Sequence, residues 1–236
     1  MTCSAAPLAL DRCRFAVVDV ETTGTRAERD GRILELAVAV LEAGTIHLAY
    51  EAVLDPGTRI PAWVTGLTGI TEREVAGRPR FGDVADEFRR VLADGVFVAH
   101  NARFDWRFLA AECVAAGVPA PMGAPLCTVR LTRRLVPELR RRGLDQVAAF
   151  FAVDNPARHR AFGDALATAH VLRALLGRAA ERGITTLADL IDLHDRPRHG
   201  KVRSAEWGMR SINPKVEERT TSPFDSALRT PHSAPE

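Results

Sequence analysis

The sequence predicts a mixed α/β domain, a sheet with helices on both faces, over about the first 194 of its 236 residues. Three strand-like apolar segments follow one another in the N-terminal half. Helical and strand-like patterns then alternate, and the last patterned segments are helical. With 46% hydrophobic and 26% charged residues, the chain can bury a core of this size.

The first predicted strand covers residues 15–21. Both of its faces begin with apolar side chains, as in a central strand that is covered on each side. The next two strands, over residues 32–41 and 46–54, flank Ala43-Gly44 and are therefore expected to form a hairpin. These three segments predict a meander at the start of the sheet.

The elements after the hairpin are assigned from helical periods and from short apolar runs. We expect short helices over 61–76, a helix over 81–93, a strand over 95–99, a helix with Phe104, Phe108, Ala111 and Ala115 on its inner stripe, a strand over 125–131, and helices over 144–152, 160–182 and 185–193.

Residues 195–236 carry prolines and scattered charges without a sustained period, and we expect this tail to be largely disordered. No apolar run reaches the roughly 18–20 residues that span a bilayer, and the N-terminus makes a poor signal peptide. The four cysteines show neither CxxC nor zinc-like spacing and are expected to be reduced thiols. These features predict a cytoplasmic protein without a membrane partner. The net charge of +2 does not by itself indicate a partner.

Two carboxylates, Asp19 and Glu21, end the first predicted strand. At positions i and i+2 they share one face, about 7 Å apart. Because buried like charges repel and lose hydration, a divalent cation between them would compensate both. A strand-end acidic pair that reaches solvent is the alternative, so this motif needs further support.

That support comes from Asp105 and Asp164. Asp105 lies one turn into a helix that follows a buried strand, which brings it to the rim of the sheet. His159 precedes Asp164 by five residues, and the two converge more easily if His159 sits in a turn and the helix begins near Arg160. Four carboxylates without basic partners in their own motifs indicate a site for two divalent metals.

The segments FAVVDVETTG, FVAHNARFDWRFL and HRAFGDALATA resemble, in order, the three exonuclease motifs of the DEDDh family of 3′–5′ exonucleases. The pattern is similar to that of the proofreading epsilon subunit of bacterial DNA polymerase III and of stand-alone exonucleases. The resemblance covers roughly residues 13–180. It implies a ribonuclease-H-like fold with a mixed five-stranded sheet flanked by helices.

The resemblance also implies an activity, the release of nucleoside 5′-monophosphates from a 3′ end with two Mg²⁺ or Mn²⁺ ions as cofactors. Asp19, Glu21, Asp105 and Asp164 would hold the metals, and His159 would be the general base. Two features depart from the family pattern. Gly163 weakens the helix by about 1 kcal/mol. Thr68 stands where some proofreading subunits have His, which bears on DNA proofreading.

Substrate contacts are also expected from the resemblance. Thr22 would meet the terminal nucleotide through its backbone, and Ile70 would wedge against the terminal base. The residues expected to line the same cleft are His100, Asn101 and Phe104, although core packing is the favoured interpretation for Phe104. Among the basic clusters, we expect Arg158 and Arg160 to contact phosphates, with a solvated surface as the alternative.

Three functions remain open at this stage. The leading one is an exonuclease on DNA, with single-stranded 3′ ends as the expected substrate. The second is an RNA exonuclease, because the distinction depends on packing around a 2′-hydroxyl. The third is a module that docks on a DNA polymerase subunit through the 195–236 tail. A dispensable tail is the alternative.

Overall fold

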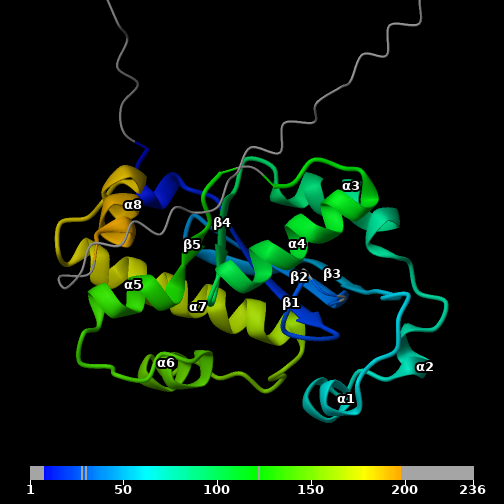
Figure 1. Ribbon diagram of the computed structural model, residues 1–236. Coiled ribbons are helices and arrows are strands. Elements are labelled where there is room, and N and C mark those ends of the chain that lie inside the picture. The colour runs from blue at the N-terminus through cyan, green and yellow to red at the C-terminus, as the bar shows by residue number, and fades with distance from the viewer. Residues whose placement is uncertain (1–7, 28, 30, 122, 198–236) are drawn as a thin grey trace, which may run out of the picture. The chain divides into compact units, whose positions relative to one another are not determined.

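The computed structural model describes residues 8–197 except 28, 30 and 122 (Figure 1). This part of the chain contains a five-stranded sheet in the order β3-β2-β1-β4-β5. β1 is antiparallel to β2 and parallel to β4, so the expected mixed sheet is confirmed. The strands are β1 Phe15–Thr22, β2 Ile33–Glu42, β3 Thr45–Val53, β4 Val96–Ala99 and β5 Leu126–Cys127.

The predicted hairpin joins β2 to β3 through Ala43 and Gly44. Both residues have positive φ, 47° and 78°, as a two-residue turn that matches the strand twist requires. β1 lies at the centre of the sheet, and only Asp19 and Glu21 of its side chains are partly exposed. The central strand therefore carries two acidic residues close to its C-terminal end.

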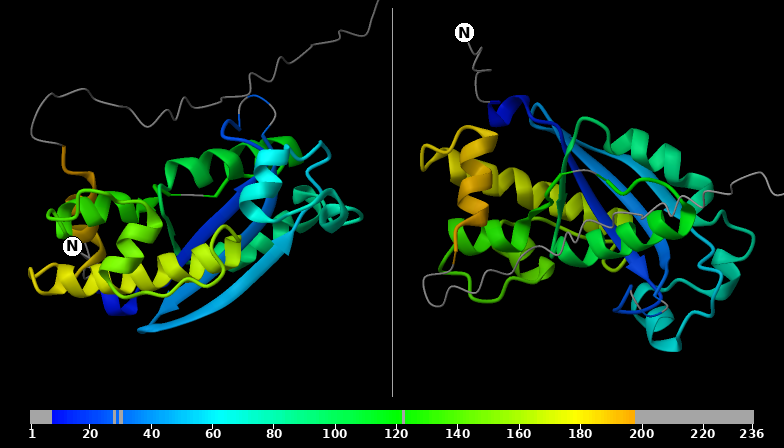
Figure 2. Two further views of the ribbon diagram at one scale, coloured as in Figure 1. Left: turned by 90° about the horizontal axis from the view of Figure 1, so that it is seen from below. Right: turned by 45° about the horizontal axis from the view of Figure 1, so that its top comes forward.

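Helices cover both faces of the sheet (Figure 2). Phe15 and Val17 pack with residues of α5, α6, α7 and α8, whereas Ala16 and Val18 pack on the other face with α3 and α4. The helices are α1 Ala62–Thr68, α2 Glu72–Val75, α3 Phe81–Leu92, α4 Arg103–Ala116, α5 Thr128–Leu135, α6 Leu144–Phe150, α7 Ala161–Ala180 and α8 Leu187–Asp195, with a 3₁₀ turn at Leu10–Arg12.

The expected strand over 125–131 is wrong beyond its first residues. β5 pairs only Leu126 and Cys127 with the short β4, and α5 begins at Thr128. The buried positions of α5 are Thr128, Leu131, Thr132 and Leu135, which have a helical spacing. Two of them are threonines, so the apolar pattern was too sparse to reveal the helix.

The inner stripe of α4 also differs from the expectation. Phe108 is buried, but Phe104 and Ala111 are only partly buried and Ala115 is exposed. The buried face runs through Asp105, Phe108, Leu109, Glu112 and Cys113. Two carboxylates lie on this face, so hydrophobicity alone pointed to a stripe rotated away from it.

The two ends of the folded part lie together. Ala9 forms an isolated bridge with Thr186, and Leu10 N–H donates to the Thr185 carbonyl over 2.9 Å. The compact unit ends at Arg196. Residues 198–236, for which we expect disorder, lie outside the described residues, as does Cys3. Among the described residues, no helix has the length and apolar character to cross a membrane.

Candidate active site

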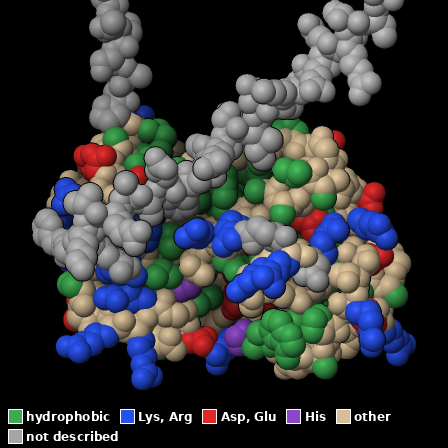
Figure 3. All heavy atoms as spheres, viewed as in Figure 1, with side chains coloured by type: hydrophobic (Ala, Val, Ile, Leu, Met, Phe, Trp, Pro, Cys, Tyr) green, Lys and Arg blue, Asp and Glu red, His purple; other side chains and the backbone are tan. Residues whose placement is uncertain are grey.

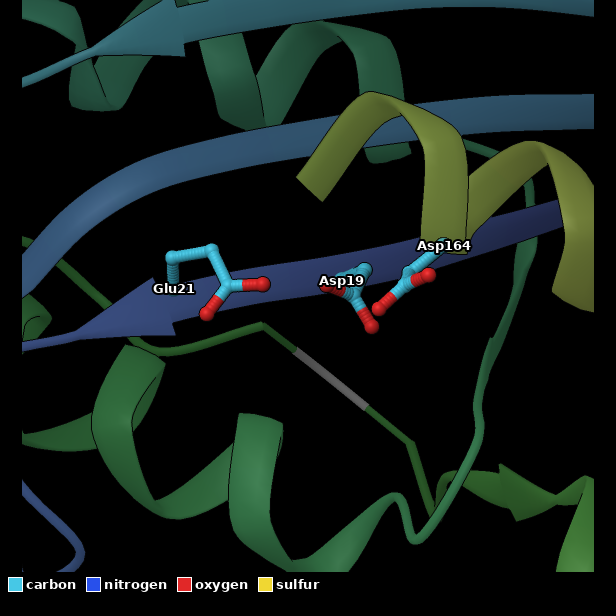
Figure 4. Close-up of side chains that lie close together, drawn as sticks. All are labelled: Asp19, Glu21 and Asp164. Atoms are coloured by element: carbon cyan, nitrogen blue, oxygen red, sulfur yellow. The ribbon is translucent and has the colours of Figure 1, made fainter. Parts of the chain in front are cut away.

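Three carboxylates meet at the end of β1 (Figure 4). Asp19 and Glu21 project from the strand, and Asp164 comes from the first turn of α7, which packs on this face of the sheet. One oxygen of each lies within 4.8 Å of the others. The alternation of β1 places Asp19 and Glu21 on the side of Phe15 and Val17, toward α7. Residues 145 positions apart in sequence thus share one acidic cluster.

Electrostatic strain in this cluster is pronounced. Burial, followed by repulsion from Asp105, Asp164, Glu21 and Glu35, raises the pKa of Asp19 well above its usual range. Burial and the same kind of repulsion raise the pKa of Glu21 to about 8, although Arg160 lowers it. Burial also raises the pKa of Asp164. The ionised forms therefore need positive charge that the nearby side chains only partly supply.

Asp105 reaches the cluster from the opposite layer. It is 3% exposed in the first turn of α4, and burial raises its pKa to about 7. The backbone N–H groups of Asp105 and Val20 oppose this increase. Asp105 is not among the three residues whose ligand atoms converge, but its charge repels that of Asp19. Its place at the rim of the sheet agrees with the expectation from sequence.

His159 lies in the turn before α7, and the helix begins at Ala161, as the His-to-Asp spacing led us to expect. It is half-buried, and its charge and backbone both lower the pKa of Asp164. Its φ of 60° is left-handed, a conformation that costs a non-glycine residue about 1–3 kcal/mol. The surrounding contacts must therefore maintain this turn.

Gly163 explains how the turn folds over the start of α7. A Cβ at this position would lie 2.2 Å from the carbonyl oxygen of Ala157. The same carbonyl accepts a hydrogen bond from Arg160 N–H. A glycine that weakens the helix intrinsically is thus required for the close approach of the segment that carries His159.

A buried ion pair anchors the same end of α7. The Glu35 carboxylate is fully buried on β2, directly opposite Glu21. It accepts 3.1 Å hydrogen bonds from Arg160 Nε, a 2.6 Å bond from Arg160 Nη2 and a 2.7 Å bond from the Ala161 N–H. Arg160 Nη2 also contacts Glu74 of α2 at 3.1 Å. This guanidinium is therefore engaged by two carboxylates, and its expected contact with a phosphate would have to compete with them.

Asn155 makes a further contact that the sequence did not indicate. Its Nδ2 donates to Asp164 Oδ1 over 2.6 Å, which lowers the pKa of Asp164. Its own Oδ1 is buried without a hydrogen-bond partner among the described residues. One of the three clustered carboxylates is thus oriented by a side-chain amide.

The cluster suits a hard divalent cation. Its donors are all carboxylate oxygens, the ligands that Mg²⁺ and Mn²⁺ prefer, and they converge within the distance that one ion can bridge. Burial first, and then repulsion from the surrounding carboxylates, raises the pKa of Asp19 and of Glu21, and a bound cation would oppose both effects. The residues therefore fit the metals that the sequence led us to expect.

Three of the residues with expected substrate contacts lie in the segments that carry Glu21 and Asp105. Thr22 is buried at the β-bulge that follows Glu21, and its Oγ1 donates to the Gly24 carbonyl over 2.6 Å. Asn101 is exposed at the turn before α4. Phe104 packs against Phe108, with ring centroids 4.9 Å apart, which confirms the core-packing interpretation.

Hydrogen bonds hold the His100 ring at both of its nitrogens. Its Nδ1 lies 2.8 Å from Thr128 Oγ1 and its Nε2 lies 2.9 Å from the Arg142 carbonyl. Burial lowers the pKa of His100 to about 4, so the ring is neutral near pH 7. A neutral imidazole that donates from Nε2 must accept from the Thr128 hydroxyl. The two nitrogens therefore link the turn after β4 to the start of α5 and to the loop before α6.

The expectation that Ile70 wedges against the terminal base is wrong. Its side chain is fully buried and packs with Leu34, Val64 and Val75. The exposed apolar side chains of this segment are Trp63 and Leu67 on α1, at 56% and 50% exposure. Figure 3 shows a hydrophobic patch over α1 with a histidine at its border. The helical period of α1 turns Trp63 and Leu67 outward, whereas Ile70 follows the end of that helix.

Arg158 is exposed, and its guanidinium pairs with Asp145 at the start of α6. Its expected phosphate contact would have to compete with this pair. Among the residues that the sequence missed, Glu35 did leave a signal, because it is the single charge inside the apolar run ILELAVAVL. Asn155 left none, since an asparagine before proline is an ordinary turn residue.

Comparison with known proteins places this geometry in context. The RNase_T exonuclease family model matches residues 16–172. DNA polymerase III PolC-type from Streptococcus sanguinis is 31% identical over 234 residues, 95% of this chain and 16% of the relative. The 3′-5′ exonuclease DinG of Bacillus subtilis is 32% identical over 181 residues, 77% of this chain and 19% of the relative. The chain thus spans less than a fifth of either relative.

Solved structures share the fold. Exonuclease X in complex with 5′ overhanging duplex DNA is 26% identical, with a TM-score of 0.62 over 76% of this chain and 99% of that one. The nuclease domain of a DEDDh family member bound to rAMP is 16% identical, with a TM-score of 0.58 over 75% of this chain and 96% of that one. The ribonuclease-H-like fold expected from the sequence is confirmed.

Proposed function

Because the chain belongs to the RNase_T exonuclease family, we propose that it is a metal-dependent 3′–5′ exonuclease of the DEDDh class that releases nucleoside 5′-monophosphates from nucleic acid. The observation that carries the proposal is the convergence of Asp19, Glu21 and Asp164 within 4.8 Å at the end of the central strand. His159 lies beside that cluster and could move a proton there.

Asp19, Glu21 and Asp164 would hold one divalent cation, and Asp19 with Asp105 a second. Bound ions of this kind lower the pKa of a water molecule and stabilise the negative charge that develops on phosphate and leaving oxygens. The chain itself supplies the fixed carboxylates, and it sets them on a strand and two helices that packing makes rigid. Such preorganised groups require little rearrangement during reaction.

His159 would act as the general base that accepts the proton of the attacking water. A positioned base contributes about 10²–10⁴ in rate. The neighbouring carboxylate of Asp164 would favour the imidazolium that forms. Substrate cleavage would break the bond between phosphorus and the 3′ oxygen and leave a free 3′-hydroxyl.

We place DNA first as the substrate, because Exonuclease X, the 26% identical neighbour, was solved in complex with DNA. RNA is the alternative, and the neighbour bound to rAMP is the reason to test it. Attachment to a polymerase is supported by the PolC-type relatives, and it concerns the tail beyond residue 197.

The test is a timed digestion of 5′-labelled single-stranded DNA and RNA of the same sequence, with Mg²⁺, Mn²⁺ or EDTA. We expect a metal-dependent ladder that shortens from the 3′ end, faster on DNA, and no ladder from the Asp164→Ala variant. Faster digestion of RNA would reverse the substrate assignment. Equal digestion by Asp164→Ala would refute the site.

A further inference from the structure

Arg160 occupies the position between the proposed base and the helix that carries Asp164. It follows His159 directly and precedes Ala161, the first residue of α7. Its Nε and Nη2 bind Glu35, and Nη2 also contacts Glu74. A single guanidinium therefore connects β2, α2 and the turn before α7.

Glu35 completes the anchor. Its carboxylate is fully buried and accepts the Ala161 N–H, one of the backbone donors that the start of a helix leaves without an intrahelical partner. The residue before Arg160 is the left-handed His159. Two consecutive residues after His159 are thus fixed to one buried carboxylate, which limits how far the strained turn can relax.

We propose that Glu35 and Arg160 are positioning residues that hold the His159 turn beside Asp164, so that Arg160 acts on the reaction through His159 and not by binding a substrate phosphate. The proposal rests on the proposed function, because it takes His159 as the base. Lysine cannot replace arginine here, since an ammonium lacks the planar fork that binds both oxygens of Glu35 while reaching Glu74.

The experiment is a double-mutant cycle between Arg160→Lys and His159→Ala, measured as kcat and KM on a labelled oligonucleotide. If Arg160 acts through His159, Arg160→Lys lowers kcat of the wild type by about 10²-fold, as expected for a misplacement near 1 Å, with little change in KM. In the His159→Ala background the same substitution lowers kcat by less than about 3-fold.

The chain offers a matched control. Arg32 binds the buried Glu112 through Nε and Nη2 at 2.8 and 2.7 Å, and Glu112 also accepts the Ile33 N–H at 3.1 Å. Arg32→Lys therefore disturbs an ion pair of the same design that does not touch the His159 turn. It should lower the melting temperature much as Arg160→Lys does, and kcat should stay within about 3-fold of the wild type.

The outcomes distinguish a failure of the positioning role from a failure of the proposed function. Equal losses from Arg160→Lys in both backgrounds, or a rise in KM alone, would overturn the positioning role and favour phosphate binding. A fully active His159→Ala would refute the base assignment, and the positioning role with it. If Arg160→Lys fails to fold, Glu35→Gln replaces it in the cycle. In metal-free protein, amide exchange of residues 157–163 should accelerate in Glu35→Gln and not in Glu112→Gln.

Asn155 carries a second, independent inference. Its 2.6 Å bond orients Asp164, and its other amide atom has no partner among the described residues, so no second hydrogen bond explains its position. We infer that Asn155 positions Asp164 for metal binding. Groups that hold a metal ligand in this way typically contribute 10–100-fold in affinity.

The measurement is Mn²⁺ affinity by calorimetry, without substrate. Asn155→Ala should weaken it about 10-fold, and Asp154→Ala, an exposed neighbour in the same loop, should leave it within about 2-fold. An unchanged affinity in Asn155→Ala would overturn the inference. Equal weakening in both variants would assign the effect to the loop as a whole and overturn it as well.

Discussion

Replacement of Gly163 by alanine should separate activity from metal binding. The new Cβ would lie 2.2 Å from the Ala157 carbonyl oxygen, and reaching 3.0 Å, below which real contacts are essentially never found, requires a shift of 0.8 Å. The obstacle is backbone, so a side-chain rotation cannot relieve it. Ala157 is two residues from His159, and the turn that carries the proposed base must therefore move.

A displacement near 1 Å at a catalytic group costs about 10²-fold in rate. We therefore expect Gly163→Ala to lower kcat about 10²-fold while Mn²⁺ affinity stays within a few-fold. Overpacking destabilises by about 1–3 kcal/mol, and the better helix propensity of alanine offsets about 1 kcal/mol of this. The melting temperature should then fall only slightly.

Gly177→Ala is the matched control in the same helix. A Cβ at Gly177 meets nothing within 4 Å, so this substitution should stabilise the protein by up to about 1 kcal/mol and leave kcat unchanged. The assay is the initial rate on a 5′-labelled oligonucleotide, beside thermal unfolding of each variant. Activity of Gly163→Ala within about 3-fold of the wild type would refute the reasoning, as would an equal loss in Gly177→Ala.

Three further results are expected. Metal-free protein should lose stability as pH rises from about 4.5 to about 8, because Glu21 ionises near pH 4.5 in the unfolded chain but stays protonated until about pH 8 in the folded protein. Thermal unfolding in the presence of EDTA measures this, and a melting temperature that rises through this pH range would contradict it. Mg²⁺ or Mn²⁺ should raise the melting temperature more at pH 8 than at pH 5, and Asp19→Asn should abolish most of that gain. We predict that Trp63, exposed on α1, stacks on a substrate base, so Trp63→Ala should raise KM about 5-fold or more with kcat unchanged, because such stacking contributes about 1–3 kcal/mol. The control is Leu8→Ala, which removes an exposed apolar side chain near the N-terminus and should leave KM unchanged.

The sequence predicted the central strand, the hairpin and the turn at His159 because each has a local cause. Apolar residues on both faces define β1, Ala43-Gly44 supports a tight turn, and the five-residue spacing to Asp164 favours a turn at His159 over one regular helix through both residues. β5 escaped prediction because a two-residue strand depends on its partner β4 and not on its own pattern.

The sequence predicted those site residues whose side-chain type indicates their chemistry. It missed those whose role depends on a contact between residues far apart in the chain. Paired carboxylates are recognisable in a sequence. That Arg160 faces Glu35, 125 positions away, is decided by how α7 lies on β2, which no local pattern encodes. Ile70 failed for the same reason, since only the tertiary packing of α1 shows which side of that segment is outside.

The bridge between Ala9 and Thr186 bears on how this folded unit can be inserted into a longer polypeptide. β1 runs from that bridge toward the acidic cluster, and α7 runs back over 20 residues, about 30 Å, so entry and exit of the chain are neighbours at the end remote from the cluster. A unit with adjacent ends can be spliced into a longer polypeptide through two short linkers without distortion. Insertion of this kind would leave the acidic cluster at the end of the unit away from both linkers.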